Sequence, residues 1–261
     1  GHPLAQIGEQ TITARHVDEI LDVSIIIAPG PKLRFGNVVV TGNEAMRTDR
    51  VLAIAGLPTG TFDPVAVTRA AKNLRRTGAF TSATVVEDDK PEGSTLPITI
   101  EVIEQTQRRI SAGIEFSTVS GLTLAGYWLH RNLFGGAERF RIDGEIAGLS
   151  GDTGGNDYSL GTTYLRPATF SQDTNLYINA NIAQLDELSF FERDASLEIG
   201  IIQNTYDDLI LGYGLGYNFG KLSDGLGDRT YSLIYAPVEG TIDMRNNPLD
   251  PTSGYYANLL V

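Results

Sequence analysis

Cysteine is absent from the 261 residues, and histidine (3), methionine (2) and tryptophan (1) are scarce. A chain without Cys has no disulfide, no thiolate metal ligand and no Cys nucleophile. His2, His16 and His130 lie too far apart in sequence to form a recognisable zinc-ligand pair. No serine stands in a Gly-x-Ser-x-Gly context. We therefore expect no enzyme, no metal site and no cofactor.

The sequence also has few basic residues and no long apolar run. Lys and Arg number 20 against 32 Asp and Glu, which gives a net charge of −12 and a pI near 4.6. An acidic chain lacks the basic surface that phosphate neutralisation requires, so no nucleic-acid partner is expected. No apolar run reaches the roughly 18 residues of a transmembrane helix, whereas a transmembrane β-barrel, which alternates instead, remains compatible with the sequence.

The first 106 residues mix strand and helix signals. Residues 4–12 and 21–27 alternate and predict a terminal hairpin that ends at Pro29-Gly30. Because Gly1 is not a start residue and a strand pattern follows at once, we expect the N-terminus to be a cut through a longer protein. Further strands are predicted at 35–41, 82–87 and 96–103.

Two helices are predicted between the first two of those strands. One spans about 48–55 and ends at Gly56. The other has Asp63 as its N-cap, Pro64 at its first position and Gly78 just past its end, which is the usual asymmetry of helix ends.

After residue 106 the chain reads as strands alone. In 138–148 the residues Arg139, Arg141 and Asp143 share one face, while Phe140 and Ile142 share the other. Nine such segments are predicted, most of them about 9 to 11 residues long, the length of a tilted membrane-crossing strand. They lie at 109–116, 121–129, 138–148, 157–166, 174–183, 194–203, 208–219, 229–239 and 254–261.

A soluble β-sandwich also alternates, so the pattern alone leaves two all-β architectures open. Tyr at segment ends, and polar or Gly residues on the second face, favour a membrane barrel with a water-filled interior. Gly212-x-Gly214-x-Gly216 is then three interior-facing glycines rather than a nucleotide loop, since no helix follows it. Residues 149–156, 184–193 and 220–228 are expected to be exposed loops at one end of this barrel.

The order strand, helix, helix, strand, strand resembles the polypeptide-transport-associated (POTRA) domain. The motif residues that carry this likeness, together with a closing Glu104, are Gly42, Gly60, Phe62, Leu74, Gly78 and Phe80. By this resemblance residues 31–106 are a complete POTRA domain and residues 1–30 are the C-terminal hairpin of a preceding one.

The stretches GIEFSTVSGLTLAGYWLHRNLFGG (113–136) and NNPLDPTSGY (246–255) resemble the barrel of the outer-membrane β-barrel assembly superfamily. Family-motif turns are carried by Asn132, Leu133, Gly135, Leu249, Pro251, Thr252 and Gly254. The chain is most similar to a TamA-like member. The fold class implied is an α+β POTRA domain followed by an antiparallel transmembrane β-barrel, of which residues 107–261 supply about nine of an expected sixteen strands.

The resemblance implies a translocation and assembly factor in the outer membrane of a Gram-negative bacterium, with POTRA domains in the periplasm. Its partners are outer-membrane lipid, unfolded β-barrel or autotransporter clients, and a periplasm-spanning or inner-membrane subunit. Clients add at a lateral seam, and the gate strand carries Ile110, Ala112, Gly113, Ile114 and Phe116. Two-partner secretion transporters, passive porins and soluble all-β binding modules are the alternatives.

Overall fold

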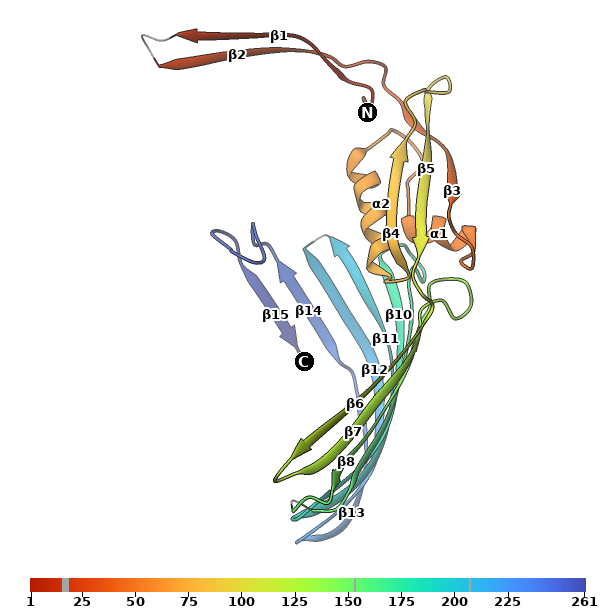
Figure 1. Cartoon of the computed structure of the whole chain (residues 1–261), viewed down its shortest axis with the longest axis vertical. Helices are drawn as coiled ribbons and strands as arrows, with labels where there is room; N and C mark the ends of the chain where they lie inside the picture. The colour runs from red at the N-terminus through yellow and green to blue at the C-terminus, as the bar shows by residue number, and fades with distance from the viewer. Residues whose placement is uncertain (16–18, 153, 207) are drawn as a thin grey trace.

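The computed structural model describes residues 1–15, 19–152, 154–206 and 208–261. Three sheets follow one another along the chain: a two-stranded hairpin, a three-stranded mixed sheet covered by helices, and a large curved antiparallel sheet (Figure 1). The hairpin and the large sheet extend from opposite ends of the mixed unit.

The hairpin consists of β1 (Gln6–Arg15) and β2 (Ile20–Ala28), where the sequence predicted strands. All of its described residues are exposed, including large apolar side chains on both strands. These are Ile7, Ile12, Ile20, Leu21, Val23, Ile25, Ile26 and Ile27. An isolated two-stranded hairpin with this much exposed apolar surface is marginal in water.

The mixed unit contains β3 (Arg34–Thr41), α1 (Thr48–Ala55), α2 (Pro64–Arg76), β4 (Phe80–Glu87) and β5 (Thr95–Glu104). Its sheet has the order β3-β5-β4, with β3 parallel and β4 antiparallel to the central β5.

The helix ends in this unit follow the sequence signals. Asp63 caps α2 by accepting from the backbone N–H of Val65 at 3.0 Å, and Pro64 opens the helix. Gly56 ends α1 in the left-handed conformation at φ 63°.

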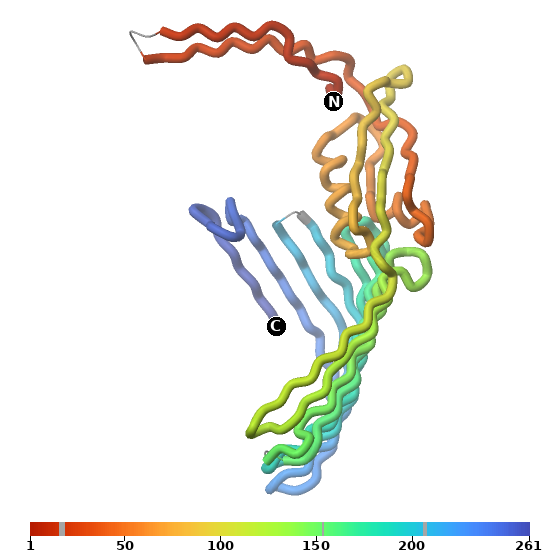
Figure 2. The backbone as a smooth tube through the Cα atoms, in the orientation of Figure 1, coloured from red at the N-terminus to blue at the C-terminus, as the bar shows by residue number. Residues whose placement is uncertain are grey.

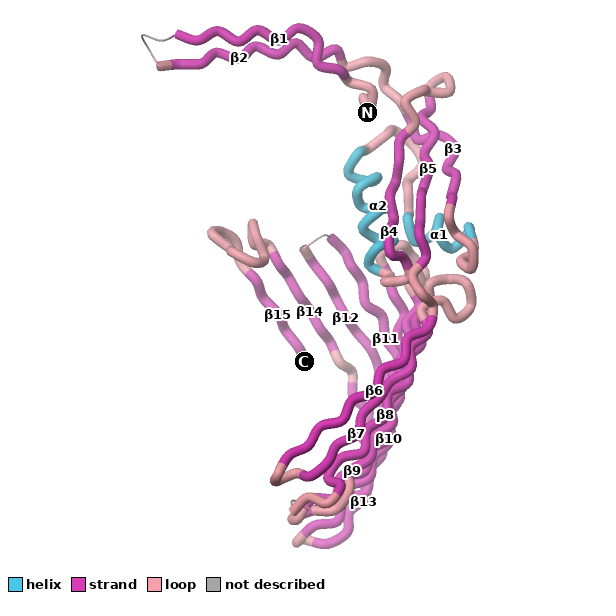
Figure 3. Tube along the Cα trace, viewed as in Figure 1, coloured by secondary structure: helices cyan, strands magenta, loops and turns pink. Residues whose placement is uncertain are grey.

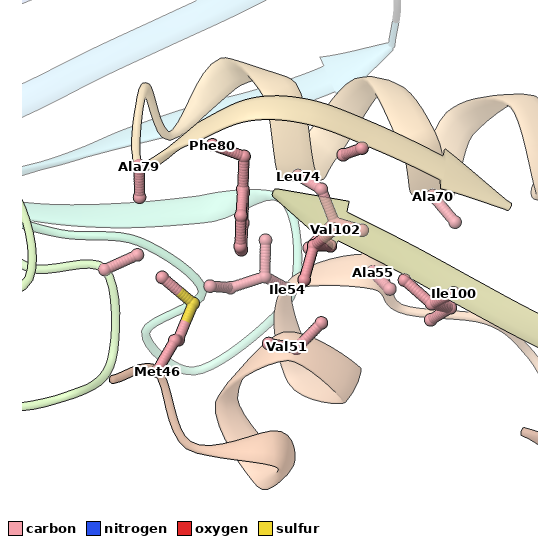
Figure 4. Close-up of a cluster of buried hydrophobic side chains, with 12 residues drawn as sticks. Met46, Val51, Ile54, Ala55, Ala70, Leu74, Ala79, Phe80, Ile100 and Val102 are labelled. Atoms are coloured by element: carbon pink, nitrogen blue, oxygen red, sulfur yellow. The ribbon is translucent and has the colours of Figure 1, made fainter. Parts of the chain in front are cut away.

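The core of the mixed unit lies between the helices and β4 and β5. Figure 4 shows Ile54 of α1, Leu74 of α2 and Val102 of β5 converging, each at most 3% exposed. Met46 and Ala137 belong to the same cluster. Because Ala137 comes from the connection that follows β7 (Gly121–His130) in the large sheet, this core continues into the next domain.

The large antiparallel sheet, here called the barrel sheet, is ordered β15-β14-β12-β11-β10-β9-β8-β7-β6, with β13 also paired to β12 (Figures 2 and 3). Its strands are β6 (Arg108–Ser117), β7 (Gly121–His130), β8 (Arg139–Leu149), β9 (Asp157–Arg166), β10 (Thr174–Glu187), β11 (Phe190–Tyr206), β12 (Leu209–Asp224), β13 (Gly227–Tyr235), β14 (Val238–Asp243) and β15 (Tyr256–Leu260).

Strand register separates the barrel sheet into an apolar and a polar face. One row across six strands reads Ile110, Trp128, Ile142, Thr162, Ala180 and Leu197. The neighbouring row, on the opposite face, reads Ser111, Tyr127, Asp143, Gly161, Asn181 and Ser196. The sequence predicted this division of the two faces, as a membrane barrel requires.

Two predictions about this sheet are wrong in detail. The segment predicted as one strand at 229–239 is two strands, β13 and β14, because Pro237 has no N–H for the ladder and interrupts the pairing. The loops expected at 184–193 and 220–228 are mostly strand, since β10 pairs with β11 as far as Glu187–Phe190 and β12 with β13 as far as Asp224–Gly227.

Candidate functional site

The first strand of the barrel sheet has a free edge. Among the described strands β6 pairs with β7 alone. Its side chains Ile110, Ile114 and Phe116 are 77%, 77% and 73% exposed. The predicted gate residues Ala112 and Gly113 lie between them, and no atom lies within 4 Å of where a Cβ on Gly113 would stand.

The ladder shows which backbone groups of β6 are unpaired. The N–H of Arg131 donates to the carbonyl oxygen of Gln107 at 2.8 Å, so this is a hydrogen-bonded pair. Such pairs alternate in an antiparallel ladder, and the β6–β7 register is unbroken. Gly113 therefore bonds to β7, whereas Ile110, Ala112, Ile114 and Phe116 point their N–H and C=O groups at the free edge.

The polar face of β6 is joined to its neighbours through one tyrosine. The guanidinium carbon of Arg141 on β8 lies 4.3 Å from the ring centroid of Tyr127 on β7, and that of Arg109 on β6 lies 6.0 Å from it. Arg141 also pairs with Asp143 at 3.1 Å. Cation–π contact thus supports the edge strand from the polar side.

Glycines on the polar face accommodate tyrosine rings farther round the sheet. The hydroxyl of Tyr177 lies where side chains on Gly200 or Gly214 would be, and the ring of Tyr235 occupies the corresponding space over Gly216. Two of the glycines singled out in the sequence, Gly214 and Gly216, therefore leave room for tyrosine side chains on this face, whereas Gly212 lies next to Glu239.

Helix α1 of the mixed unit docks on the turn between β9 and β10. Arg50 is 9% exposed, and its Nη2 donates to the carbonyl oxygen of Pro167 at 2.6 Å. Burial and the nearby charge of Arg166 lower the pKa of Arg50, while Glu138 acts in the opposite direction. In the same contact, a side chain on Gly56 would collide with Gln172.

A second contact involves the family-motif turn between β7 and β8. The carbonyl of Gly135, at φ 81°, accepts from the N–H of Arg47 at 2.9 Å. Asn132 closes the turn by accepting from the N–H of Ala137 at 3.0 Å, and Leu133 donates to the Glu138 carbonyl at 3.2 Å.

The side chain of Glu138 organises that turn from inside. It is 3% exposed, and its Oε2 accepts from the N–H groups of Phe134 at 3.2 Å and Gly136 at 2.9 Å. A Cβ on Gly136 would meet both Glu138 and Arg50. The two docking contacts therefore share one tightly packed group of side chains.

The closing residue of the POTRA motif braces the same end of the mixed unit. Glu104 Oε1 accepts from three successive backbone N–H groups, those of Glu44 at 2.9 Å, Ala45 at 3.0 Å and Met46 at 2.8 Å. One carboxylate thereby orders the loop that leads into α1 and ties it to the end of β5.

The remaining POTRA motif residues are either buried in the core or have backbone conformations that favour glycine. Phe62, Leu74 and Phe80 are buried at 2%, 0% and 7% exposure. Gly42 has φ 83°, and a side chain there would collide with the carbonyl of Val102. Gly60 and Gly78 have φ 130° and 65°, conformations that favour glycine.

The second family-motif turn connects β14 to β15. Asn246 Oδ1 accepts from the N–H groups of Thr252 and Ser253, both at 3.1 Å. Gly254 has φ 97°. Leu249, two residues before Pro251, is 97% exposed at the tip of the turn.

Sequence reasoning missed Arg50 and Glu138 as docking residues. Both stand in ordinary contexts, Arg50 on a helix and Glu138 at a strand start, and a single charged residue gives no sign of a partner 117 positions away. The HRNLFGG turn could have indicated this contact from the sequence, because the backbone of its Gly135 lies against Arg47 of the mixed unit.

The described residues hold no group of three or more His, Asp or Glu side chains that could bind a metal ion. His16 lies outside the described residues. None of the described helices is long and apolar enough to span a membrane.

Comparison with known proteins finds a family match for the mixed unit and a curated relative for a longer stretch of the chain. Residues 33–105 match the POTRA family model, described as surface antigen variable number repeat. The outer membrane protein assembly factor BamA of Nitratidesulfovibrio vulgaris is 25% identical over 136 residues, which are 52% of this chain and 17% of that protein.

Solved structures share the fold over nearly the whole chain. BamA from Haemophilus ducreyi lacking POTRA domains 1–3 gives a TM-score of 0.68 at 15% identity, covering 100% of this chain and 53% of that one. CdiB from Acinetobacter baumannii and CdiB from Escherichia coli give 0.64 and 0.60 at 10% identity, each covering 94% of this chain. They are covered to 48% and 47% of their own length, so this chain spans about half of these relatives.

The order of elements, the POTRA match and the shared fold agree with one another. The predicted fold class is confirmed as a POTRA domain followed by part of an antiparallel β-barrel. Residues 33–105 match the POTRA family, and the chain as a whole shares its fold with BamA and CdiB and has sequence similarity to BamA over about half of its length.

Proposed function

We propose that this chain is part of an outer-membrane assembly factor that inserts β-barrel or autotransporter clients, and that β6 is its gate strand. The observation that carries the proposal is the place of β6, which follows the POTRA domain directly as the first strand of the barrel sheet and pairs on one side with β7. Four residues with unpaired backbone groups also carry exposed apolar or small side chains: Ile110, Ala112, Ile114 and Phe116.

The physical reason is the cost of an unpaired backbone in lipid. Each N–H or C=O without a partner in hydrocarbon costs several kcal/mol, so an open strand edge favours the addition of another strand. A client strand that pairs with β6 forms backbone hydrogen bonds along this edge, and the client's side chains play a minor part. No nucleotide is needed for this step.

The POTRA domain holds the gate in place from the periplasm. The docking contacts of Arg50 and Arg47 join it to the turns that precede β8 and β10. We propose domain limits at 1–30, 31–106 and 107–261, with the exposed β1–β2 hairpin completing a preceding POTRA domain. A TamA-like role with a periplasm-spanning or inner-membrane partner belongs to the same proposal.

The test uses two proline variants of the full-length protein in lipid vesicles. Ile114→Pro removes an N–H that points at the free edge, where proline is tolerated within a sheet. We expect the barrel to fold and the folding of an added unfolded client to slow by at least about tenfold, since a lost ladder bond costs about 1 to 3 kcal/mol. Client folding is followed by heat-modifiable gel mobility.

The matched control is Ile114→Val, which keeps the N–H and the apolar side chain. Gly113→Pro serves as a second comparison, because its N–H pairs with β7 and its loss should weaken the protein's own barrel. Normal client folding by the Ile114→Pro variant would contradict the assignment of β6 as the gate.

A two-partner secretion transporter is the second candidate, supported by the shared fold with two CdiB structures. Such a protein passes its client through the pore, whereas an insertase leaves the client in the bilayer. Protease digestion of client added to reconstituted vesicles separates the two: an inserted barrel is protected in the membrane, and a transported chain is released on the far side.

A further inference from the structure

Two cations face each other at the outer end of the apolar face. Arg193 near the start of β11 pairs in register with Lys221 near the end of β12, and both side chains are exposed. This end of the barrel sheet, where β13 lies, is the one farthest from the POTRA domain (Figure 1). Since the POTRA domain is periplasmic, the pair lies at the level of the outer leaflet.

The pair stands at the border of the apolar surface. Inward from Arg193 the same face of β11 carries Ala195, Leu197, Ile199 and Ile201, and inward from Lys221 that of β12 carries Phe219. Long cationic side chains at such a border extend their charge to the lipid headgroups.

Neither cation has an acidic partner among the described residues. Arg193 donates to Gln184 Oε1 at 2.9 Å and lies 4.9 Å over the ring of Phe191, while no ion pair joins Lys221 to a described carboxylate. On this face the next carboxylates, Asp186 and Asp228, stand one row farther out. Like charges directly opposite on neighbouring strands are destabilising, so the pair calls for an anion.

Two apolar hollows lie next to each other on this face, and the larger one is lined by Arg193. One, of about 810 Å³, reaches from Arg193 and Gln184 across Tyr158 to Gly144 and Gly126, where missing side chains deepen the surface. The other, of about 340 Å³, runs beside it along Ala180, Ala195 and Phe219. They share Leu160 and Ile182, which form a ridge between them.

We propose that this surface binds a phosphorylated glycolipid of the outer leaflet. Its phosphate groups lie on Arg193 and Lys221, and its acyl chains lie in the two hollows on either side of Leu160 and Ile182. The outer leaflet of a Gram-negative outer membrane consists of such lipids, which carry several chains and more than one phosphate. Two adjacent cations and two adjacent hollows match that chemistry better than a lipid with a single phosphate.

The bound lipid would cover the barrel wall beside the gate. The larger hollow ends at Ala112 and Ile114 of β6, so a glycolipid held by Arg193 occupies the outer surface next to the free edge. This inference depends on the membrane location of the barrel and is independent of the proposed client insertion.

The experiment measures lipid retention by native mass spectrometry on the full-length protein in mild detergent. Its variant is Arg193→Gln with Lys221→Gln, and its control is Arg229→Gln, which removes a cation at the same end but on the polar face. We expect the double variant to bind added phosphorylated glycolipid about thirtyfold more weakly than the wild type, and the control to bind normally. Glycolipid with its phosphates removed should bind as weakly as the variant does.

A second pair of variants keeps the test valid if the double variant folds poorly. Arg193→Lys retains the charge and should retain binding, whereas Gly144→Leu fills the larger hollow and should reduce binding with both cations in place. Equal retention by the double variant and the wild type would overturn the proposal. Equal binding of dephosphorylated glycolipid, or of phosphatidylglycerol, would overturn it as well.

Discussion

The guanidinium of Arg50 in the POTRA domain donates to the carbonyl oxygen of Pro167 in the barrel at 2.6 Å. A buried cation thus satisfies a carbonyl at the turn between β9 and β10. Because the proline ring fixes the backbone φ of Pro167 and Ala168 follows at φ 47°, this turn has few ways of rearranging to bring the carbonyl to another donor. The contact fixes where helix α1 sits on the periplasmic rim.

Removing this contact should loosen the domain junction. Arg50→Ala leaves the Pro167 carbonyl unpaired and removes the buried side chain, at a cost of about 2 kcal/mol. We expect faster amide hydrogen exchange in residues 167–174 and in α1, measured by mass spectrometry on the full-length protein. Asp49→Ala, on the exposed side of the same helix, is the control. Unchanged exchange in both segments would show that Arg50 does not hold the junction.

Residues 31–106 should fold without the barrel. They include both helices, the whole three-stranded sheet and nearly all of the buried cluster around Leu74 and Ile100. We expect a mixed α/β circular dichroism spectrum and one cooperative thermal transition from this fragment. A spectrum of disordered chain would mean that Ala137 and the barrel turns are essential to the core.

Glu104 should be the most sensitive carboxylate in that fragment. Glu104→Ala leaves three N–H groups without their acceptor, so the free energy of unfolding should fall by about 2 to 4 kcal/mol. Glu101→Ala, on the exposed side of the same strand, should change it by less than about 0.5 kcal/mol. Urea denaturation of both variants compares the two, and equal effects would remove any special role for the Glu104 contact.

The two faces of the barrel sheet should respond differently to an added cation. Ile142→Arg places a charge on the apolar face, at a cost of about 2 to 4 kcal/mol at mid-membrane, whereas Glu145→Arg lies on the polar face and stays hydrated. Glu145 makes no ion pair in the described part of the chain, so its replacement removes no contact of that kind. Heat-modifiable mobility of the two full-length variants reports assembly. Identical assembly would indicate a soluble sheet.

Periodicity predicted the strands because each face of the sheet has a different solvent. The strand at 157–166 has the predicted bounds, α2 begins at its Asp63 cap, and α1 ends at Gly56 as the sequence indicated. The extension of β10 to Glu187 and β11 back to Phe190 was not predicted, since polar residues outside the bilayer pair as strands without leaving an apolar stripe.

The candidate site was predictable only in part. The gate strand followed from family resemblance, and its assignment as a gate stays a prediction. Which of its N–H groups face outward depends on the Gln107–Arg131 hydrogen bond, a register that the sequence does not reveal. The Arg50 contact and the Arg193–Lys221 pair depend on strands and turns far apart in the chain.

The role of β6 as gate is tested most directly by disulfide capture of a client strand. The described segment has no native Cys, so Ala112→Cys on β6 and Ala180→Cys on β10 can be compared in the full-length protein with a client carrying one Cys in its terminal strand. Both alanines lie on the apolar face, but Ala180 is paired on both sides, to Thr162 and Leu197. We expect crosslinking at Ala112→Cys at least about tenfold above that at Ala180→Cys, because only an unpaired edge brings a client backbone within the roughly 6 Å between Cα atoms that a disulfide spans. Equal capture at the two positions would contradict the gate assignment.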